Sequence, residues 1–101
     1  MRRSGKSYAH PLIVLYALKT ENPRSRVGVT AGTTVGNAVR RNRAKRLMRE
    51  AMRTLYPEIS PGNDLMLIAR TSLADSDLEQ TRLALAGLLR RAGLIAPTHV
   101  D

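Results

Sequence analysis

The sequence predicts an α/β fold: a two-layer sandwich in which a small mixed sheet is packed by two helices. Three observations support it: apolar segments with strand character, two segments with helical periodicity, and the order strand, strand, helix, strand, helix. The 101 residues, 43% of them hydrophobic, suffice for one domain with a small core. We therefore expect a single domain over residues 1–101, with an ordered core over about residues 8–95.

Two strands are expected before the first helix. Residues 12–18 (LIVLYAL) are apolar on both faces and rich in β-branched and aromatic side chains, which indicates a buried strand. Residues 25–31 (SRVGVTA) alternate apolar and polar positions, which is typical of a half-buried strand. Its polar face holds Arg26, Gly28 and Thr30.

A long helix and a third strand follow. The helix is predicted from Asn37 to Tyr56, because Pro57 disfavours helical geometry in the residue before it. After a turn rich in Pro, Gly and Asn, residues 65–69 form the expected strand.

A second amphipathic helix closes the chain. The sequence SDLE at residues 76–79 matches a capping box and predicts the start of the helix, and Gly93 predicts its end. The expected core-facing side chains are Leu78, Leu85, Leu88, Leu89 and Ala92.

The first helix has two unlike faces. At about 100° per residue, its apolar side chains fill an arc of roughly 140°, which we expect to face the core. They are Leu47, Ala51, Ala44, Leu55, Met48 and Met52. The opposite arc holds Lys45, Arg49, Asn42, Arg53, Arg46 and Arg43, with Glu50 placed to pair with Arg46.

This concentration of positive charge indicates a polyphosphate ligand. Like charges four residues apart, such as Lys45 and Arg49, destabilise a helix by roughly 0.2–0.5 kcal/mol per pair, so a solvated face selected for stability would mix the signs. Arginine outnumbers lysine on this face, and its planar fork suits phosphate oxygens and base stacking.

The overall charge points in the same direction. The net charge of +9 and the isoelectric point near 11.3 favour a nucleic acid, or else an anionic membrane surface, as the partner. The chain lacks an apolar segment of about 20 residues and a secretory signal, so we expect a cytoplasmic protein with no membrane partner. RNA fits better than DNA, because the charged helix connects strands of a small sheet rather than lying in a helical bundle.

The residues for catalysis or for a metal centre are not evident. The chain has no cysteine, and its two histidines lie near opposite ends. It shows neither convergent carboxylates nor a histidine with supporting neighbours. We expect no catalytic and no metal-binding residues in the protein itself.

Residues 25–53 (SRVGVTAGTTVGNAVRRNRAKRLMREAMR) resemble the signature region of the protein component of bacterial ribonuclease P. The mark of that region is an Arg-Asn-Arg core followed by Lys-Arg and then Arg, here Arg41, Asn42, Arg43, Lys45, Arg46 and Arg49. The segments HPLIVLYAL, GNDLMLIAR and LEQTRLALAGLLRRAGL resemble the family's first strand, the strand after the charged helix and the closing helix. The resemblance covers roughly residues 8–95.

The resemblance implies a fold detail and a function. It implies a left-handed crossover through the charged helix, against the general preference for right-handed connections. It further implies an accessory subunit that binds the catalytic RNA of ribonuclease P and the 5′ leader of precursor tRNA. Magnesium ions bound by the RNA then perform the cleavage.

The residues expected to carry these contacts form two sets. The RNA-binding set comprises Arg40, Arg41, Asn42, Arg43, Lys45, Arg46, Arg49 and Arg53. The leader-binding set comprises Tyr16, Arg26 and Thr30. For Tyr16 the residues alone leave open a core aromatic position, and the resemblance implies a position that faces the leader. The alternative function is a structural RNA-binding protein of the ribosome or a related particle.

The chain departs from the family pattern at two places. Family members carry an N-terminal helix with aromatic residues before the first strand, and we expect this helix to be absent from a chain that opens with MRRSGKSYAH and has no phenylalanine. Ahead of the charged helix, Gly32, Thr33 and Thr34 replace the Ser-Lys-Lys of the family.

Overall fold

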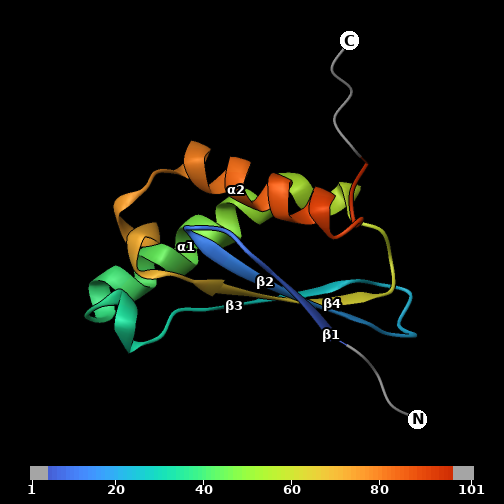
Figure 1. Cartoon of the computed structure of the whole chain (residues 1–101), viewed down its shortest axis with the longest axis horizontal. Helices are drawn as coiled ribbons and strands as arrows, with labels where there is room; N and C mark the ends of the chain where they lie inside the picture. The colour runs from blue at the N-terminus through green and yellow to red at the C-terminus, as the bar shows by residue number, and fades with distance from the viewer. Residues whose placement is uncertain (1–4, 97–101) are drawn as a thin grey trace.

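The computed structural model describes residues 5–96 and has two layers. Its strands are β1 (Gly5–Ala9), β2 (Ile13–Lys19), β3 (Arg26–Thr30) and β4 (Asn63–Ala69), and its long helices are α1 (Ala38–Leu55) and α2 (Leu78–Arg91). Short 3-10 helices lie at η1 (Thr33–Val35), η2 (Tyr56–Glu58) and η3 (Thr71–Asp75). Both long helices cover the same face of the sheet (Figure 1), which confirms the predicted α/β sandwich.

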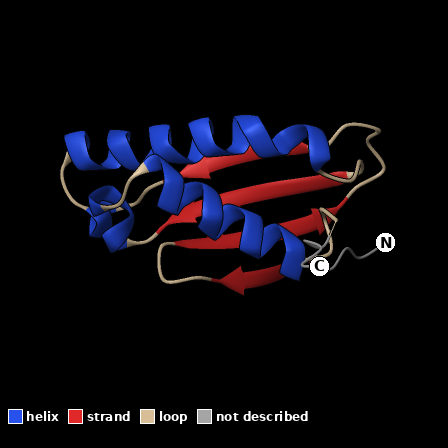
Figure 2. Ribbon diagram, turned by 90° about the horizontal axis from the view of Figure 1, so that it is seen from above, coloured by secondary structure: helices blue, strands red, loops and turns tan. Residues whose placement is uncertain are grey.

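The sheet is mixed, with the strand order β1-β2-β4-β3. The strand β2 runs antiparallel to β1 and to β4, whereas β3 runs parallel to β4. The connection from β3 through α1 to β4 is therefore a crossover. When the helices face the viewer and these two strands point upward, β4 lies to the left of β3 (Figure 2), so the crossover has the rare left hand.

The first strand was missed by the sequence analysis, which predicted three strands instead of four. Its sequence, GKSYA, contains glycine and lysine, which are poor strand formers, and has no clear alternation. It is a strand because it pairs antiparallel with β2. The register runs from Gly5 opposite Leu18 to Ala9 opposite Val14. The expectation about a helix at the N-terminus concerns a region that includes residues 1–4, which lie outside the described residues.

The ends of α1 agree with the sequence signals. The side chain of Asn37 accepts a hydrogen bond from the backbone N–H of Arg40 at 3.0 Å, which caps the first turn. The helix ends at Leu55, and the chain then tightens into η2, which contains Pro57.

The start of α2 differs from the predicted capping box by one residue. Asp77 is the N-cap, and its Oδ1 accepts a hydrogen bond from the backbone N–H of Gln80 at 2.8 Å. Ser76 instead donates its hydroxyl hydrogen to the carbonyl oxygen of Leu73 at 2.7 Å. A carboxylate also interacts with the helix dipole, which explains why Asp77 can replace the expected serine. Gly93 follows the helix with a φ of 73°, as expected for its end.

The core lies between the sheet and the two helices. From the sheet it receives the fully buried side chains of Ile13, Leu15 and Leu67. From α1 it receives Ala44, Met48, Ala51, Met52 and Leu55. Leu47, which we expected in this set, is only half-buried, and Leu78 at the start of α2 is 46% exposed. A periodic pattern defines an apolar face, but the position of the neighbouring sheet and helix decides which residues lie at its margin.

None of the helices within residues 5–96 is long and apolar enough to cross a membrane.

Candidate nucleic-acid interface

One side of α1 carries polar side chains that have no partner within the described part of the chain. We call this set the basic arc, and it consists of Arg41, Asn42, Lys45, Arg46 and Arg49. Asn42, Arg46 and Arg49 are exposed, and Arg41 and Lys45 are half-buried. Within residues 5–96, none of the five side chains forms a hydrogen bond or an ion pair. Their charges and hydrogen-bond donors are therefore available to a ligand.

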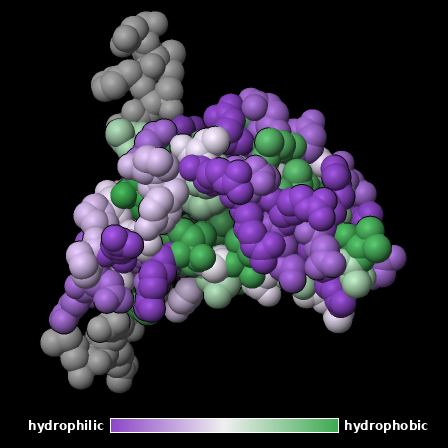
Figure 3. All heavy atoms as spheres, turned by 180° about the vertical axis from the view of Figure 1, so that it is seen from behind, coloured by the Kyte–Doolittle hydropathy of each residue, from purple (hydrophilic) through white to green (hydrophobic). Residues whose placement is uncertain are grey.

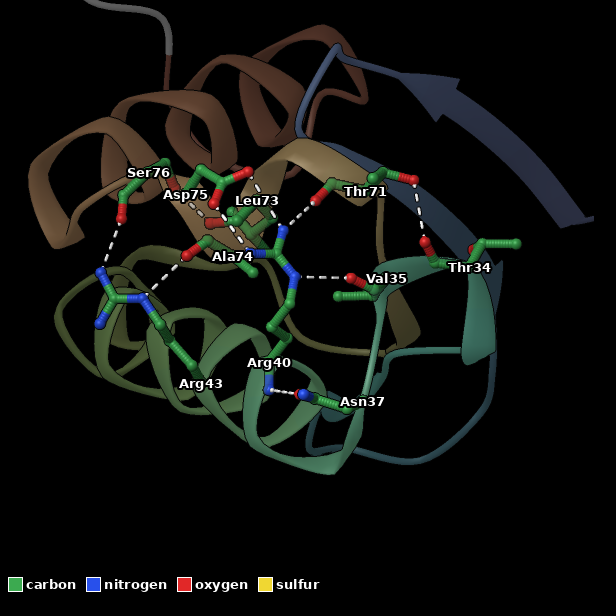
Figure 4. Close-up of polar contacts among 10 residues, drawn as sticks. All are labelled: Thr34, Val35, Asn37, Arg40, Arg43, Thr71, Leu73, Ala74, Asp75 and Ser76. Carbon is green, nitrogen blue, oxygen red and sulfur yellow. Dashed lines mark hydrogen bonds and ion pairs between the residues drawn. The ribbon is translucent and has the colours of Figure 1, made fainter.

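Arg40, which we expected to bind RNA, is committed to contacts inside the protein (Figure 4). Its guanidinium forms a fork with the carboxylate of Asp75, at 2.9 Å for Nη1 to Oδ1 and 3.1 Å for Nη2 to Oδ2. Its Nε donates to the carbonyl oxygen of Val35 at 2.9 Å. Arg40 thus links η1 and η3 to the first turn of α1.

Arg43 makes similar contacts one turn further along the helix (Figure 4). Its Nε donates to the carbonyl oxygen of Ala74, and its Nη2 donates to that of Ser76, both at 2.9 Å. These carbonyls belong to the segment that leads from β4 into α2. Two of the eight expected RNA-binding side chains therefore hold this segment against α1.

Gly36 is required where the chain enters α1. Its φ of 137° is a conformation that L side chains rarely adopt, and a Cβ atom there would lie 2.7 Å from the Cδ of Arg40. The glycine makes room for the arginine stem that passes beside it.

The ion pair between Arg40 and Asp75 affects the titration of the carboxylate. The hydrogen bond from Arg40 and the charge of Arg40 lower the pKa of Asp75, with a lesser contribution from the charge of Arg43 and with burial acting in the opposite direction. In the unfolded chain the pKa of an aspartate is about 3.9. Because the folded pKa is the lower one, ionised Asp75 stabilises the fold above the unfolded pKa, and this contribution disappears as the pH falls through the folded pKa.

We expect Asp75→Asn to flatten the acid dependence of stability. The thermal midpoint of the unchanged protein should fall below about pH 4, and the part of this fall that belongs to Asp75 should be absent from the variant. Thermal unfolding between pH 2 and pH 7 measures it. Glu21→Gln is the matched control, because Glu21 is exposed and its carboxylate forms no hydrogen bond or ion pair within residues 5–96. Equal pH profiles for Asp75→Asn and the unchanged protein would contradict the assignment.

Arg53 has an ion-pair partner on its own helix. Its Nη2 lies 3.3 Å from Oε2 of Glu50, so Glu50 pairs with Arg53 and not with Arg46 as we predicted. Residues three apart are helix neighbours just as residues four apart are. The side chains of Arg53 and Glu50 are 73% and 45% exposed, and such a surface pair contributes little stability, so Arg53 can exchange its partner.

The expected leader-binding residues gather on the open face of the sheet, which faces away from the helices. The strand register places Tyr16 opposite Met66, which lies beside Gly28. Tyr16 is 44% exposed, so the core interpretation of this residue is wrong. Thr30 is exposed at the end of β3.

Two details of the open face differ from the sequence analysis. Arg26 forms a fork with Asp64 on β4, at 3.0 Å for Nε to Oδ1 and 2.7 Å for Nη2 to Oδ2. Met66 and Ile68 are partly exposed there, at 40% and 37%, and were not predicted. The sequence signal for them is that β4 is apolar at alternate positions of both kinds, so its outward positions add an apolar surface to the open face of the sheet.

Within residues 5–96, no group of three or more His, Asp or Glu side chains is arranged to hold a metal ion.

A family model described as Ribonuclease P matches residues 1–93. The chain belongs to this family. Among the curated relatives named ribonuclease P protein component, one from Clostridium botulinum (strain Loch Maree / Type A3) is 43% identical over 93 residues, which covers 91% of this chain and 84% of the relative. One from Bacillus cereus (strain B4264) is 39% identical over 93 residues, with 91% and 81% covered.

Solved structures of ribonuclease P proteins share the fold. The protein from Staphylococcus aureus superposes with a TM-score of 0.80 at 30% identity, covering 91% of this chain and 84% of that one. The protein from Thermotoga maritima superposes with a TM-score of 0.78 at 33% identity, covering 87% and 84%. The mixed four-stranded sheet with two helices is thus the fold of ribonuclease P proteins.

Proposed function

We propose that this ribonuclease P protein binds the catalytic RNA of the enzyme through the basic arc and Arg53. The single observation that supports the proposal best is the arc itself. Four cationic side chains and one amide lie on one side of α1 with no partner among the described residues, although like charges at this spacing destabilise a helix. Phosphate oxygens would turn this cost into a favourable interaction.

Arg40 and Arg43 have a different role in this proposal. Their donors are used by Asp75 and by backbone carbonyls, so they position α1 and the segment before α2 instead of contacting RNA directly. The amide of Asn42, between the arginines of the arc, supplies both a donor and an acceptor, which a guanidinium does not.

The open face of the sheet is the proposed contact for the 5′ leader of precursor tRNA. It offers the aromatic ring of Tyr16 for stacking beside the exposed side chains of Met66 and Ile68. In this proposal, magnesium ions bound by the RNA perform the hydrolysis in the cytoplasm, and the protein assists 5′ maturation of tRNA by binding and charge neutralisation.

Reconstitution tests the proposal. The protein is added to a bacterial ribonuclease P RNA, and removal of the 5′ leader from a precursor tRNA is measured at limiting magnesium. We expect weak cleavage with the RNA alone, strong cleavage with both components and none with the protein alone. Stable binding to ribosomal RNA together with no effect on leader removal would instead favour the structural ribosomal alternative.

A further inference from the structure

A groove runs along the side of the molecule between the edge strand β3 and the C-terminal half of α1. Its volume is about 430 Å³, within the range of roughly 300–1,000 Å³ of small-molecule sites. Its lining residues are Val27, Gly28, Val29, Arg49, Met52, Arg53 and Tyr56. Viewed from behind, the molecule exposes hydrophobic side chains in a depression on this side, surrounded by hydrophilic ones (Figure 3).

The inner part of the groove is apolar and well anchored. Met52 is only 5% exposed, and Val27 and Val29 pack against the core. Tyr56 is 41% exposed, and its hydroxyl donates to the carbonyl oxygen of Ser25 at 2.6 Å. This hydrogen bond ties the ring to the chain just before β3. A fixed aromatic ring beside a polarisable thioether suits a flat, unsaturated group such as a nucleobase.

The rim of the groove is cationic. Arg49 has no partner within residues 5–96, and Arg53 is held only by the exposed pair with Glu50. Among the described residues, no acidic side chain lines the groove. An apolar floor beside two guanidinium groups matches a ligand that joins a flat base to an anionic phosphate.

The β3 edge adds backbone donors and acceptors. Among the described strands, β3 pairs only with β4, so alternate residues on its outer side present unpaired N–H and C=O groups. Gly28 contributes only backbone atoms to this wall. Such groups can form hydrogen bonds with the Watson–Crick edge of a base, which is free only when the base is unpaired, as in a bulge or loop.

We propose that this groove binds one unstacked nucleotide of a bound RNA, with its base beside Tyr56 and Met52 and its phosphate on Arg49 and Arg53. The site lies on the helix side of β3, separate from the open sheet face. Arg49 belongs to both the basic arc and the groove, so the two form one continuous surface that a single RNA can contact. The proposal rests on the proposed function, in which the arc binds RNA.

A pair of RNA hairpins tests the groove. One hairpin is fully paired, and the other is identical except for one bulged uridine. The unchanged protein should bind the bulged hairpin about fivefold or more tightly, since stacking of one base on an aromatic side chain is worth at least this factor. Tyr56→Leu should abolish the preference but keep the affinity for the paired hairpin, whereas Tyr56→Phe should retain the preference.

The controls separate the groove from the rest of the surface. Tyr16→Leu removes the exposed ring of the open sheet face and should leave the preference intact. A preference that survives Tyr56→Leu, or that only Tyr16→Leu abolishes, would overturn the groove proposal. If the paired hairpin binds with steep salt dependence but the bulge adds nothing, the groove proposal fails and the arc proposal stands. If neither hairpin binds, both proposals fail.

A crosslinking experiment covers the case in which Tyr56→Leu does not fold. The bulged uridine is replaced by 4-thiouridine and crosslinked to the unchanged protein, and mass spectrometry locates the adduct. An adduct within residues 49–56 or 27–29 supports the proposal, and an adduct elsewhere overturns it.

Discussion

Replacing the four cationic residues of the basic arc by glutamine is expected to weaken RNA binding at least about 100-fold at low salt, because each loses a charge-assisted hydrogen bond to phosphate. The variant changes Arg41, Lys45, Arg46 and Arg49. The log–log slope of affinity against salt should change from about −4 to about −1, since each phosphate contact contributes roughly −0.7 to −0.9. Titration of labelled ribonuclease P RNA at several salt concentrations measures both quantities.

A charge-matched control distinguishes RNA binding by the basic arc from nonspecific electrostatic attraction to the positively charged protein. Substituting glutamine at Lys6, Lys19, Arg24 and Arg70 also removes four of the nine net positive charges, but from exposed positions outside α1. This control should lose far less affinity. Equal losses in the two variants would show that binding follows net charge alone. The thermal midpoint of the arc variant should stay the same or rise, because repulsion along α1 is relieved.

Met48→Ala is expected to lower the free energy of unfolding by about 2–5 kcal/mol, because it leaves a cavity in the core. Met48 lies on the core-facing side of α1 and is completely buried. A small domain has a total stability of about 5–15 kcal/mol, so a large share would be lost. Denaturant unfolding measures the change. Leu47→Ala is the matched control and should cost less, because Leu47 is half-buried. A greater cost for Leu47→Ala would mean that the core-facing side of α1 is assigned wrongly.

Local signals in the sequence determined the class of fold, most of its elements and the family. The long helix could be located because Asn37 and Pro57 act within one turn of its ends. The polar and apolar faces of β3 followed from strict alternation. The charged side of α1 could likewise be predicted from the helical periodicity of its side chains, and its arginine motif indicated RNA. Each of these inferences depends on residues close together in the chain.

The tertiary structure alone decided which expected RNA-binding side chains are available. Arg40 and Asp75 are 35 residues apart, so no local pattern could show that they form an ion pair. The strand β1 exists through its pairing with β2, and the groove exists because the crossover places α1 beside the β3 edge. For Tyr16 the sequence alone left a core position open. In the structure, Ile13 and Leu15 of the same strand are buried under the helices, and Tyr16 points to the opposite, exposed face of the sheet. Sequence periodicity specifies which side chains share a face, but only long-range packing determines what that face meets.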